Sequence, residues 1–184
     1  MRWTEINERS EAKAPPAGFA PKVWFHGSAR AFKTFKPGND RGINELGKGV
    51  YFAGSWNYAN TWARQGGHVY RCFLRAGDVF NYDAPITPEI AHRLHAGHSA
   101  MMEERFGIPG DEAAWDFEDF EDRFLRNGKL TPEHGTMLLP LAGYVRAIMP
   151  SSQIPDQTVV FDPNDIVIVS RGAGGSWGDN DALD

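Results

Sequence analysis

The 184-residue sequence contains very little cysteine and no long hydrophobic run. Its one cysteine, Cys72, has no partner for an internal disulfide and cannot by itself supply a multi-thiolate zinc site. No apolar stretch approaches the roughly 18 residues of a membrane span, and the first residues carry charges where a signal peptide requires an apolar core. We therefore expect a cytoplasmic protein that does not contact a membrane and whose fold depends on packing alone.

The common motifs of nucleotide sites and of nucleophilic catalysis are also missing. The segment GAGGSWG lacks the G-x-G-x-x-G spacing, no G-x-x-x-x-G-K-[ST] loop occurs, and AGHSAM lacks the closing glycine of a nucleophile elbow. His92, His95 and His98 are close in sequence, but no neighbouring pattern supplies the remaining ligands of a metal site. We therefore predict no metal, and we interpret Cys72 as a buried structural thiol.

What the sequence does contain is typical of one globular domain. Hydrophobic residues make up 41% and charged residues 23%, which suffices for a core of single-domain size. The net charge of -5 is unevenly distributed, because residues 22–75 hold nine basic and two acidic residues, whereas residues 103–123 hold nine acidic and two basic ones. The basic segment can attract a phosphate-bearing ligand, and the acidic block argues against general affinity for nucleic acid. Ordinary solvated surface is the alternative for both segments, and docking of a substrate is a further alternative for the acidic one.

The composition along the chain predicts the boundaries of this domain. A flexible arm is expected over residues 1–21, one domain over 22–170 and a flexible, glycine-rich and acidic tail over 171–184. Strand-forming runs bounded by glycine or turn residues are expected at 22–26, 49–54, 68–77, 158–161 and 165–169. An α+β class follows from these strands and from the helices described next.

Helices are expected in two parts of the sequence. Between the second and third strands, residues 55–64 predict one helix with Ser55 as its cap. Residues 84–150 predict a helical insertion of three helices, two of which begin with a threonine, a proline and a glutamate at 87–89 and 131–133. The third of these predicted helices extends to residue 149.

Three segments that end or begin strands carry the residues with recognisable chemistry. They are FHGS at 25–28, GKGVYFAG at 47–54 and DQTVVFDPNDI at 156–166. In this order they resemble the motifs of the diphtheria-toxin and poly(ADP-ribose) polymerase branch of ADP-ribosyltransferases, namely His-Gly-Ser/Thr, Gly-x-Tyr-Phe and a glutamate before an apolar strand. The resemblance covers roughly residues 22–83 and 155–170. It implies a split core of two small β-sheets and NAD as co-substrate.

The resemblance assigns roles that the chemistry of the residues supports. His26 would bind ribose hydroxyls, and Gly27, followed by Ser28, would let the backbone approach the carboxamide. Tyr51 would stack on the pyridinium ring, with Trp62 as the aromatic residue on its other side. Arg30 and Lys48 are the basic residues expected to meet the pyrophosphate, and the loop at 36–48 has the size of a flap.

Gln157 departs from the family pattern at the position of the glutamate. Glutamine can hold the ribose, but it supplies no negative charge where positive charge develops in the transition state, and such a loss costs on the order of 3 kcal/mol. Chain elongation is therefore not expected. The neighbouring acid, Asp156, should point to the opposite face of its strand. Ala59 stands where the polymerases place a serine, which weakens the expected contact to nicotinamide.

The sequence thus predicts a monomeric mono-ADP-ribosyltransferase with His26, Tyr51 and Gln157 as catalytic residues. Its acceptor is expected to be a macromolecule, a protein rather than a nucleic acid. Two alternatives stay open: an inactive module that binds NAD or ADP-ribose, and a toxin-like NAD glycohydrolase. Small size and the absence of a secretion signal suit a phage or bacterial cytoplasmic effector.

Overall fold

The computed structural model describes residues 14–36, 46–107, 117–150 and 156–174. Most of the predicted arm, the middle of the predicted flap, part of the acidic block and residues 175–184 of the predicted tail lie outside the described residues.

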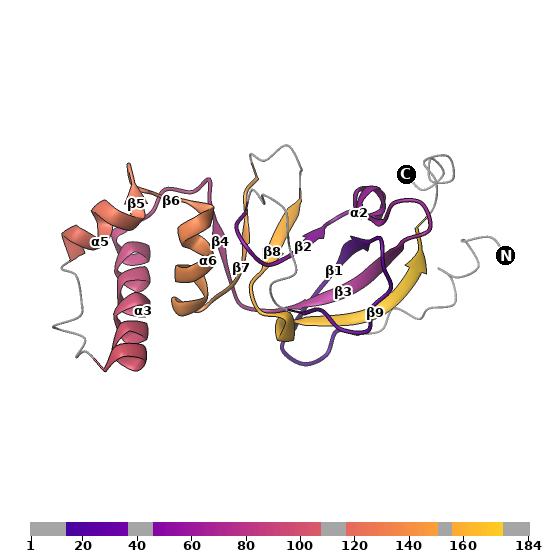
Figure 1. Ribbon diagram of the computed structural model, residues 1–184, viewed down its shortest axis with the longest axis horizontal. Coiled ribbons are helices and arrows are strands. Elements are labelled where there is room, and N and C mark those ends of the chain that lie inside the picture. The colour runs from indigo at the N-terminus through magenta and orange to yellow at the C-terminus, as the bar shows by residue number, and fades with distance from the viewer. Residues whose placement is uncertain (1–13, 37–45, 108–116, 151–155, 175–184) are drawn as a thin grey trace.

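Strands and helices alternate in an α+β arrangement, which confirms the predicted class (Figure 1). In chain order they are β1 (Phe19–Ser28), β2 (Val50–Ala53), α2 (Trp56–Ala63), β3 (His68–Arg75), β4 (Asp78–Asn81), α3 (Pro88–Phe106), α5 (Phe117–Phe124), β5 (Leu125–Arg126), β6 (Lys129–Leu130), α6 (Pro132–Leu141), β7 (Tyr144–Ile148), β8 (Gln157–Val160), the 3-10 helix η1 (Pro163–Asp165) and β9 (Ile166–Ala173). The first strand begins three residues before the predicted domain start, and the last strand runs three residues beyond the predicted end.

Within the described residues, the strands form a seven-stranded sheet in the order β4-β7-β8-β2-β1-β3-β9 and a small β5-β6 ribbon. The pair β4 and β7 is parallel, and the other neighbours in the large sheet are antiparallel. Strands β1 and β2 meet in register only at Phe25 and Ala53. The two small sheets expected from the sequence are therefore the two halves of one hydrogen-bonded series, joined at this narrow junction.

Helix α2 packs on the half of the sheet that contains β1 and β3. Its cap is the predicted Ser55, whose hydroxyl accepts a hydrogen bond of 3.2 Å from the backbone N–H of Tyr58. Ala59 and Ala63 form the buried side of the helix and pack with Ala53 and Val69 of the sheet. Small residues on this side bring the helix close to the strands.

Helix α6 packs against β7 in the other half of the sheet, α3 packs on α6, and α5 packs on α3 (Figure 1). Thr87 and Thr131 cap α3 and α6 as predicted, and each is followed by proline at the first helical position. The predicted helix over 131–149 is wrong in its second half, because α6 ends at Leu141 and Tyr144–Ile148 form β7. Gly143 adopts a φ of +79°, which turns the chain into the sheet.

Hydrophobic side chains fill both halves. Leu94, Phe120 and Leu138 of the helices pack with Ala147 and Val159 of the sheet in one cluster. A second cluster around β1, β2 and β3 contains Trp24, Phe52, Tyr70, Cys72 and Leu74. In the part of the chain that the structure describes, no helix is long and apolar enough to cross a membrane.

Candidate nucleotide site

A cavity of about 570 Å³ opens between the end of β1, strand β2 and helix α2. Five residues that the sequence predicted for the site line it together: His26, Gly27, Ser28, Tyr51 and Trp62. The other lining residues are Phe25, Ala29, Phe52, Ala53, Tyr58, Ala59 and Arg64. The walls are mostly aromatic and apolar with a few polar groups, a composition typical of small-molecule sites.

His26 is fixed in one tautomer by the backbone of β2. Its Nδ1 lies 2.8 Å from the carbonyl oxygen of Tyr51, and because a carbonyl only accepts, Nδ1 carries the proton and donates. Phe35 and Phe52 pack around the ring with centroid distances of 5.0 and 5.7 Å. Burial lowers the pKa of His26 below its ordinary value of 6.5, and the hydrogen bond to Tyr51 only partly opposes this. The neutral ring then presents Nε2 as a hydrogen-bond acceptor.

Gly27 lies directly under helix α2. A β-carbon at this position would come within 1.8 Å of the Ala59 carbonyl oxygen and 2.8 Å of the Ala63 backbone nitrogen. The residue must therefore be glycine so that α2 can close one side of the cavity. The helix packing alone explains the glycine of the FHGS segment, and the expected backbone contact to a carboxamide stays a prediction.

Tyr51 lines the cavity, and its hydroxyl holds the segment before β2. The hydroxyl donates to the carbonyl oxygen of Gly47 at 2.6 Å and accepts from the backbone N–H of Leu46 at 3.0 Å. These contacts fix the ring in place, which suits it to a stacking role. Leu46 and Gly47 follow directly after the undescribed part of the predicted flap.

Helix α2 contributes Tyr58, Trp62 and Arg64. Tyr58 and Trp62 are one helical turn apart, and their rings meet edge to face with centroids 6.4 Å apart. Trp62 is 59% exposed, so in this state its ring is available to a ligand in the cavity. Arg64 follows the last residue of the helix with a φ of +56° and supplies a positive charge to the lining. Sequence reasoning missed Tyr58 and Arg64, although the four-residue spacing of Tyr58 from Trp62 was a usable signal.

Gln157 lies beside the cavity at the start of β8. It is directly opposite Ala53 on β2, so its side chain shares a face of the sheet with Ala53 and with Tyr51 two residues earlier. Its Oε1 is buried and, among the described residues, has no hydrogen-bond partner. Gln157 is not itself among the residues that line the cavity, although its partner Ala53 is, so the structure places this unpaired oxygen beside the cavity and not in its wall.

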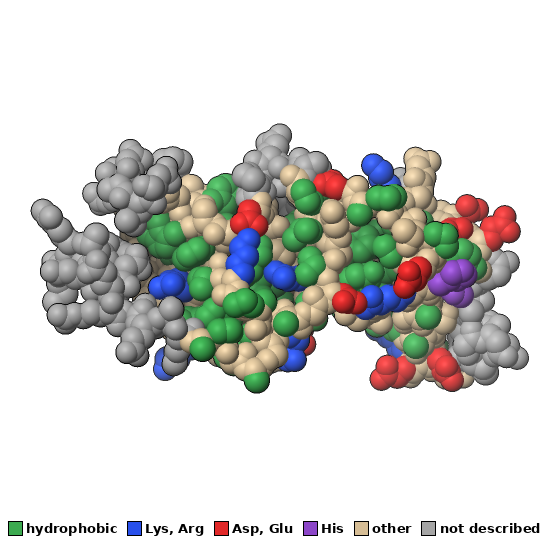
Figure 2. Space-filling model, turned by 180° about the vertical axis from the view of Figure 1, so that it is seen from behind, with side chains coloured by type: hydrophobic (Ala, Val, Ile, Leu, Met, Phe, Trp, Pro, Cys, Tyr) green, Lys and Arg blue, Asp and Glu red, His purple; other side chains and the backbone are tan. Residues whose placement is uncertain are grey.

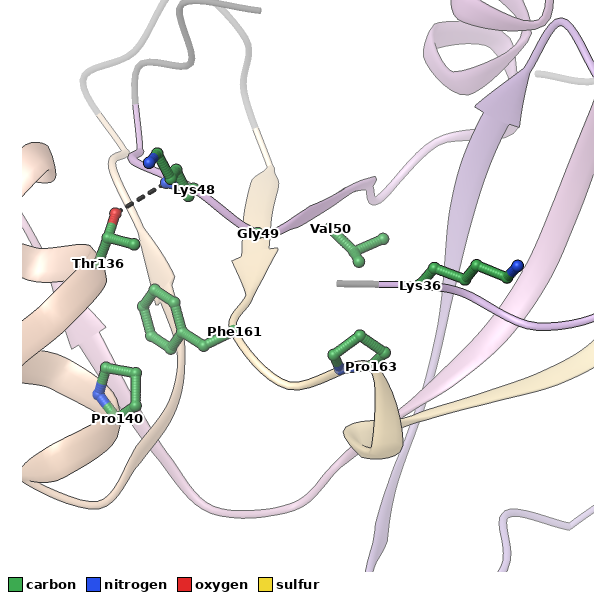
Figure 3. Close-up of a pocket in the computed structure, with 8 residues that line it drawn as sticks. All are labelled: Lys36, Lys48, Gly49, Val50, Thr136, Pro140, Phe161 and Pro163. Carbon is green, nitrogen blue, oxygen red and sulfur yellow. Dashed lines mark hydrogen bonds between the residues drawn. The ribbon is translucent and has the colours of Figure 1, made fainter. Parts of the chain in front are cut away.

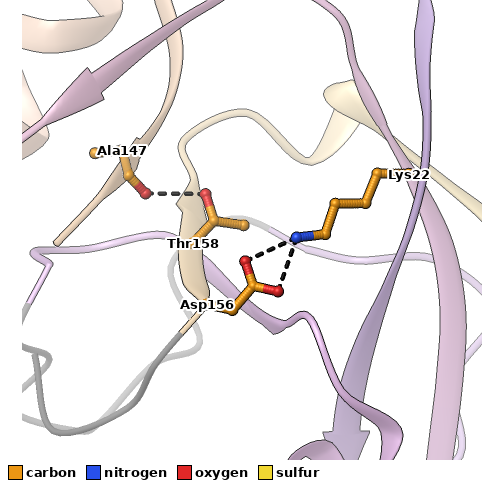
Figure 4. Close-up of polar contacts among 4 residues, drawn as sticks. All are labelled: Lys22, Ala147, Asp156 and Thr158. Atoms are coloured by element: carbon orange, nitrogen blue, oxygen red, sulfur yellow. Dashed lines mark hydrogen bonds and ion pairs between the residues drawn. The ribbon is translucent and has the colours of Figure 1, made fainter. Parts of the chain in front are cut away.

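Asp156 turns away from this arrangement. It has a φ of +60°, and both carboxylate oxygens accept hydrogen bonds from Lys22 Nζ, at 2.7 and 2.8 Å (Figure 4). The Asp156 carboxylate also lies over Gly54, where a β-carbon would meet it at 1.7 Å. The acid next to Gln157 is therefore engaged with β1 and does not take the place of the missing glutamate.

The predicted pyrophosphate contacts are not gathered at this cavity. Lys48 lines a different cavity of about 140 Å³ between β2, α6 and Phe161, and its backbone N–H donates to Thr136 Oγ1 at 2.7 Å (Figure 3). Arg30 follows β1, where its backbone N–H and carbonyl pair with the Ser28 hydroxyl at 3.2 and 2.9 Å. The hydroxyl of Ser28 thus stabilises the turn at the edge of the cavity that His26 lines.

The histidines of α3 pack against aromatic side chains. His92 stacks on Phe117 at 4.1 Å, and His95 and His98 contact Phe120 at 5.2 and 5.8 Å. Among the described residues, no group of three or more His, Cys, Asp or Glu side chains is placed to hold a metal ion. Cys72 is fully buried, and burial raises the pKa of its thiol, so this thiol is unreactive.

Comparison with known proteins agrees with this geometry. A family of sequences described as the ADP-ribosyltransferase in polyvalent proteins matches residues 18–174, from the residue before β1 to the residue after β9. A search of curated proteins found none that matches. The matched region contains the cavity with His26, Tyr51 and Trp62 and also the helices α3, α5 and α6. The chain therefore belongs to the ADP-ribosyltransferases of polyvalent proteins, a family whose chemistry is the transfer of ADP-ribose.

Proposed function

We propose that the protein transfers a single ADP-ribose from NAD to a side chain of another protein and releases nicotinamide. Membership of the family supports ADP-ribosyl transfer in general. The observation that carries the finer proposal is a neutral acceptor in the cavity lining with a second one beside it, on the residue opposite Ala53. These are the Nε2 of His26, set by the bond from Nδ1 to Tyr51, and the unpartnered Oε1 of Gln157.

These two acceptors suit the ribose groups of NAD. A ribose presents hydroxyl donors, and each acceptor can bind one without changing its protonation state. In this assignment Tyr51 and Trp62 enclose the cationic nicotinamide ring, an attraction worth about 0.5 to 2 kcal/mol that disappears when nicotinamide leaves as a neutral molecule. Arg64 is the arginine in the cavity lining, and in this assignment its positive charge pairs with the pyrophosphate.

In the proposed reaction, the bond between the nicotinamide nitrogen and the ribose carbon breaks, and its electron pair leaves with nicotinamide. The acceptor side chain forms the new bond to the same carbon and gives up its proton. Gln157 offers a dipole instead of a negative charge to the developing positive charge, which stabilises it less. A neutral group also cannot activate a sugar hydroxyl of an earlier ADP-ribose as a base, and this is the reason for proposing one transfer.

Gln157 also favours a second candidate function, a module that binds NAD or ADP-ribose without turning it over. The aromatic walls and the two neutral acceptors serve binding as well as catalysis. The missing charge at Gln157 affects only the reaction. Both candidates would therefore bind NAD, and only the transferase would release nicotinamide.

The deciding experiment follows nicotinamide release from NAD that carries a label on its adenylate part, with and without added cell lysate. Release together with label on a protein supports the proposed transferase. Release without lysate identifies a glycohydrolase, label on nucleic acid refutes the protein acceptor, and binding without release identifies the binding module.

The matched variants for this experiment are His26→Ala and His68→Ala. His68 lies on β3 opposite Ser28, one strand away from the cavity lining, so its loss should leave release and binding unchanged. Loss of both readouts in His26→Ala alone would tie the activity to this cavity. Equal effects of the two substitutions would show that the activity lies elsewhere.

A further inference from the structure

Trp24 of β1 and Arg146 of β7 meet on the face of the sheet that carries the second hydrophobic cluster. Trp24 and Val160 both belong to that cluster, and Arg146 is the register partner of Val160 on the neighbouring strand. The guanidinium carbon of Arg146 lies 5.6 Å from the centroid of the Trp24 ring. Residues far apart in the sequence are thus brought together, although β8 and β2 lie between their strands in the sheet.

Both residues bury a hydrogen-bond donor that has no acceptor. Trp24 is only 4% exposed, and its Nε1 has no partner among the described residues. The Nε of Arg146 is also buried without a partner within the described chain, and no ion pair of its guanidinium occurs there. Buried donors are almost always paired with an acceptor, so two unpaired donors at one place need an explanation.

The charges around Trp24 show which kind of acceptor would fit. Lys22 Nζ lies 4.1 Å from the centroid of the Trp24 ring, and this ammonium group is paired with Asp156. Figure 4 shows Lys22 reaching from β1 to the carboxylate at the start of β8. Lys22, Asp156 and Arg146 together therefore carry one uncompensated positive charge.

Arg146 is only partly exposed, so its charge is partly removed from water. The face seen in Figure 2 shows acidic and basic side chains set among hydrophobic ones. Burial lowers the pKa of Arg146 below its ordinary value, although arginine stays charged at neutral pH. A bound anion would compensate the guanidinium and give both buried donors an acceptor.

We propose that Trp24 and Arg146, supported by Lys22, form a binding site for a carboxylate group supplied from outside the described chain. A carboxylate is a monoanion with two acceptor oxygens, so it matches the single uncompensated charge and the two unpaired donors. Trp24, Arg146 and Lys22 are not among the residues that line the cavity of His26, and the site does not depend on the proposed function.

The test uses the indole N–H resonance of Trp24 in the full-length protein, assigned by its disappearance in Trp24→Phe. Sodium acetate replaces sodium chloride stepwise, so that the ionic strength stays constant, and a titration with sodium chloride alone is the comparison. A saturable shift with acetate and none with chloride is expected. Arg146→Gln should weaken acetate binding by about tenfold or more, because charge-assisted hydrogen bonds are lost. The control Arg171→Gln changes an exposed arginine on β9 and should leave acetate binding unchanged.

Arg146→Lys keeps the charge but removes the Nε donor, and it replaces Arg146→Gln if that variant does not fold. Weaker acetate binding in Arg146→Lys supports the proposed hydrogen bonds. An unsaturable shift, an equal shift with chloride or unchanged binding in the Arg146 variants overturns the proposal and leaves water as the partner of the two donors.

Two further titrations separate the sources of the anion. A peptide that contains glutamate should compete with acetate if the carboxylate comes from a protein side chain, whereas free glutamate alone would compete if the natural ligand is a small acid. Tighter binding of inorganic phosphate than of acetate refutes the carboxylate assignment.

Discussion

The backbone of Gly27 lies against the carbonyl group of Ala59, at a distance that leaves no room for a side chain on β1. This contact sets the position of α2 and with it the positions of Tyr58, Trp62 and Arg64 in the cavity wall. The cavity is therefore shaped by backbone packing at the place where the FHGS segment ends. The first prediction follows from this contact.

Gly27→Ala should push α2 away from β1, because its methyl group cannot fit beneath the helix. We expect a loss of about 1 to 3 kcal/mol in the free energy of unfolding, as in other overpacked cores. Urea unfolding measures the loss, and NAD titration measures the accompanying loss of affinity. Unchanged stability would show that α2 does not rest on this glycine.

Tyr51→Phe and Tyr51→Ala should separate the two roles of this tyrosine. The phenylalanine variant keeps the ring but loses the hydrogen bonds to Gly47 and Leu46, so it should lose about 1 to 2 kcal/mol of stability and keep NAD binding. The alanine variant should lose NAD binding as well. Calorimetric titration and thermal unfolding give the two readouts, and equal NAD affinity of both variants would contradict stacking on the ring.

Gln157→Glu should accelerate nicotinamide release, because it places a negative charge beside the cavity where positive charge develops. One electrostatic contact of this kind changes rates by about 100-fold, so a rise of at least about tenfold is expected. Single-turnover measurements of release give the comparison. Gln157→Ala is the control for a merely structural role, and an unchanged rate in both variants would show that residue 157 lies away from the ribose.

Stability should fall on acidification because of His98, which is buried between α3 and α5. Burial lowers its pKa below the ordinary value of 6.5, and the charges of His95 and Arg123 lower it further. The folded protein therefore binds fewer protons than the unfolded chain below this pH, so the free energy of unfolding decreases as the pH falls through 6.5 toward the pKa of the folded state.

The measurement for His98 is urea unfolding at pH about 7.5 and about 5.5, on either side of the histidine range. The variant His98→Gln should lose less stability than the original protein between these two pH values. His92→Gln is the control, because His92 is exposed and lies nearer the N-terminal end of α3. An equal pH dependence of the original protein and His98→Gln would exclude His98 as the cause.

Local signals in the sequence predicted several elements correctly because their causes are local. Ser55, Thr87 and Thr131 cap helices through contacts with residues three positions later, and the sequence shows both partners. Tyr144–Ile148 was assigned to a helix because the apolar pattern of α6 continues into it. This segment pairs with residues of β4 that lie 66 or 67 positions away and with residues of β8 that lie 10 to 14 positions away. A local pattern does not show such partners.

The candidate site was predictable where its residues lie on neighbouring strands. His26 and Tyr51 were assigned from their motifs, and the structure places both at one cavity. Lys48 was assigned by its closeness in sequence to Tyr51, but Thr136 of α6 holds its backbone at a different cavity. Arg64 went unnoticed because its place in the lining depends on how α2 ends above the sheet.

Because β4 and β7 pair in parallel, the segment between them, which contains α3, α5 and α6, can be replaced by another without changing the rest of the sheet. Asp78 lies opposite Tyr144, so the chain leaves the sheet after Asn81 and returns one strand over, about 10 Å back along the strand direction. A segment anchored at two such close points can change in length at little entropic cost, provided that it still covers Ala147 and Val159. One cavity between β1, β2 and α2 can therefore be combined with different helical attachments, each presenting its own surface to a target.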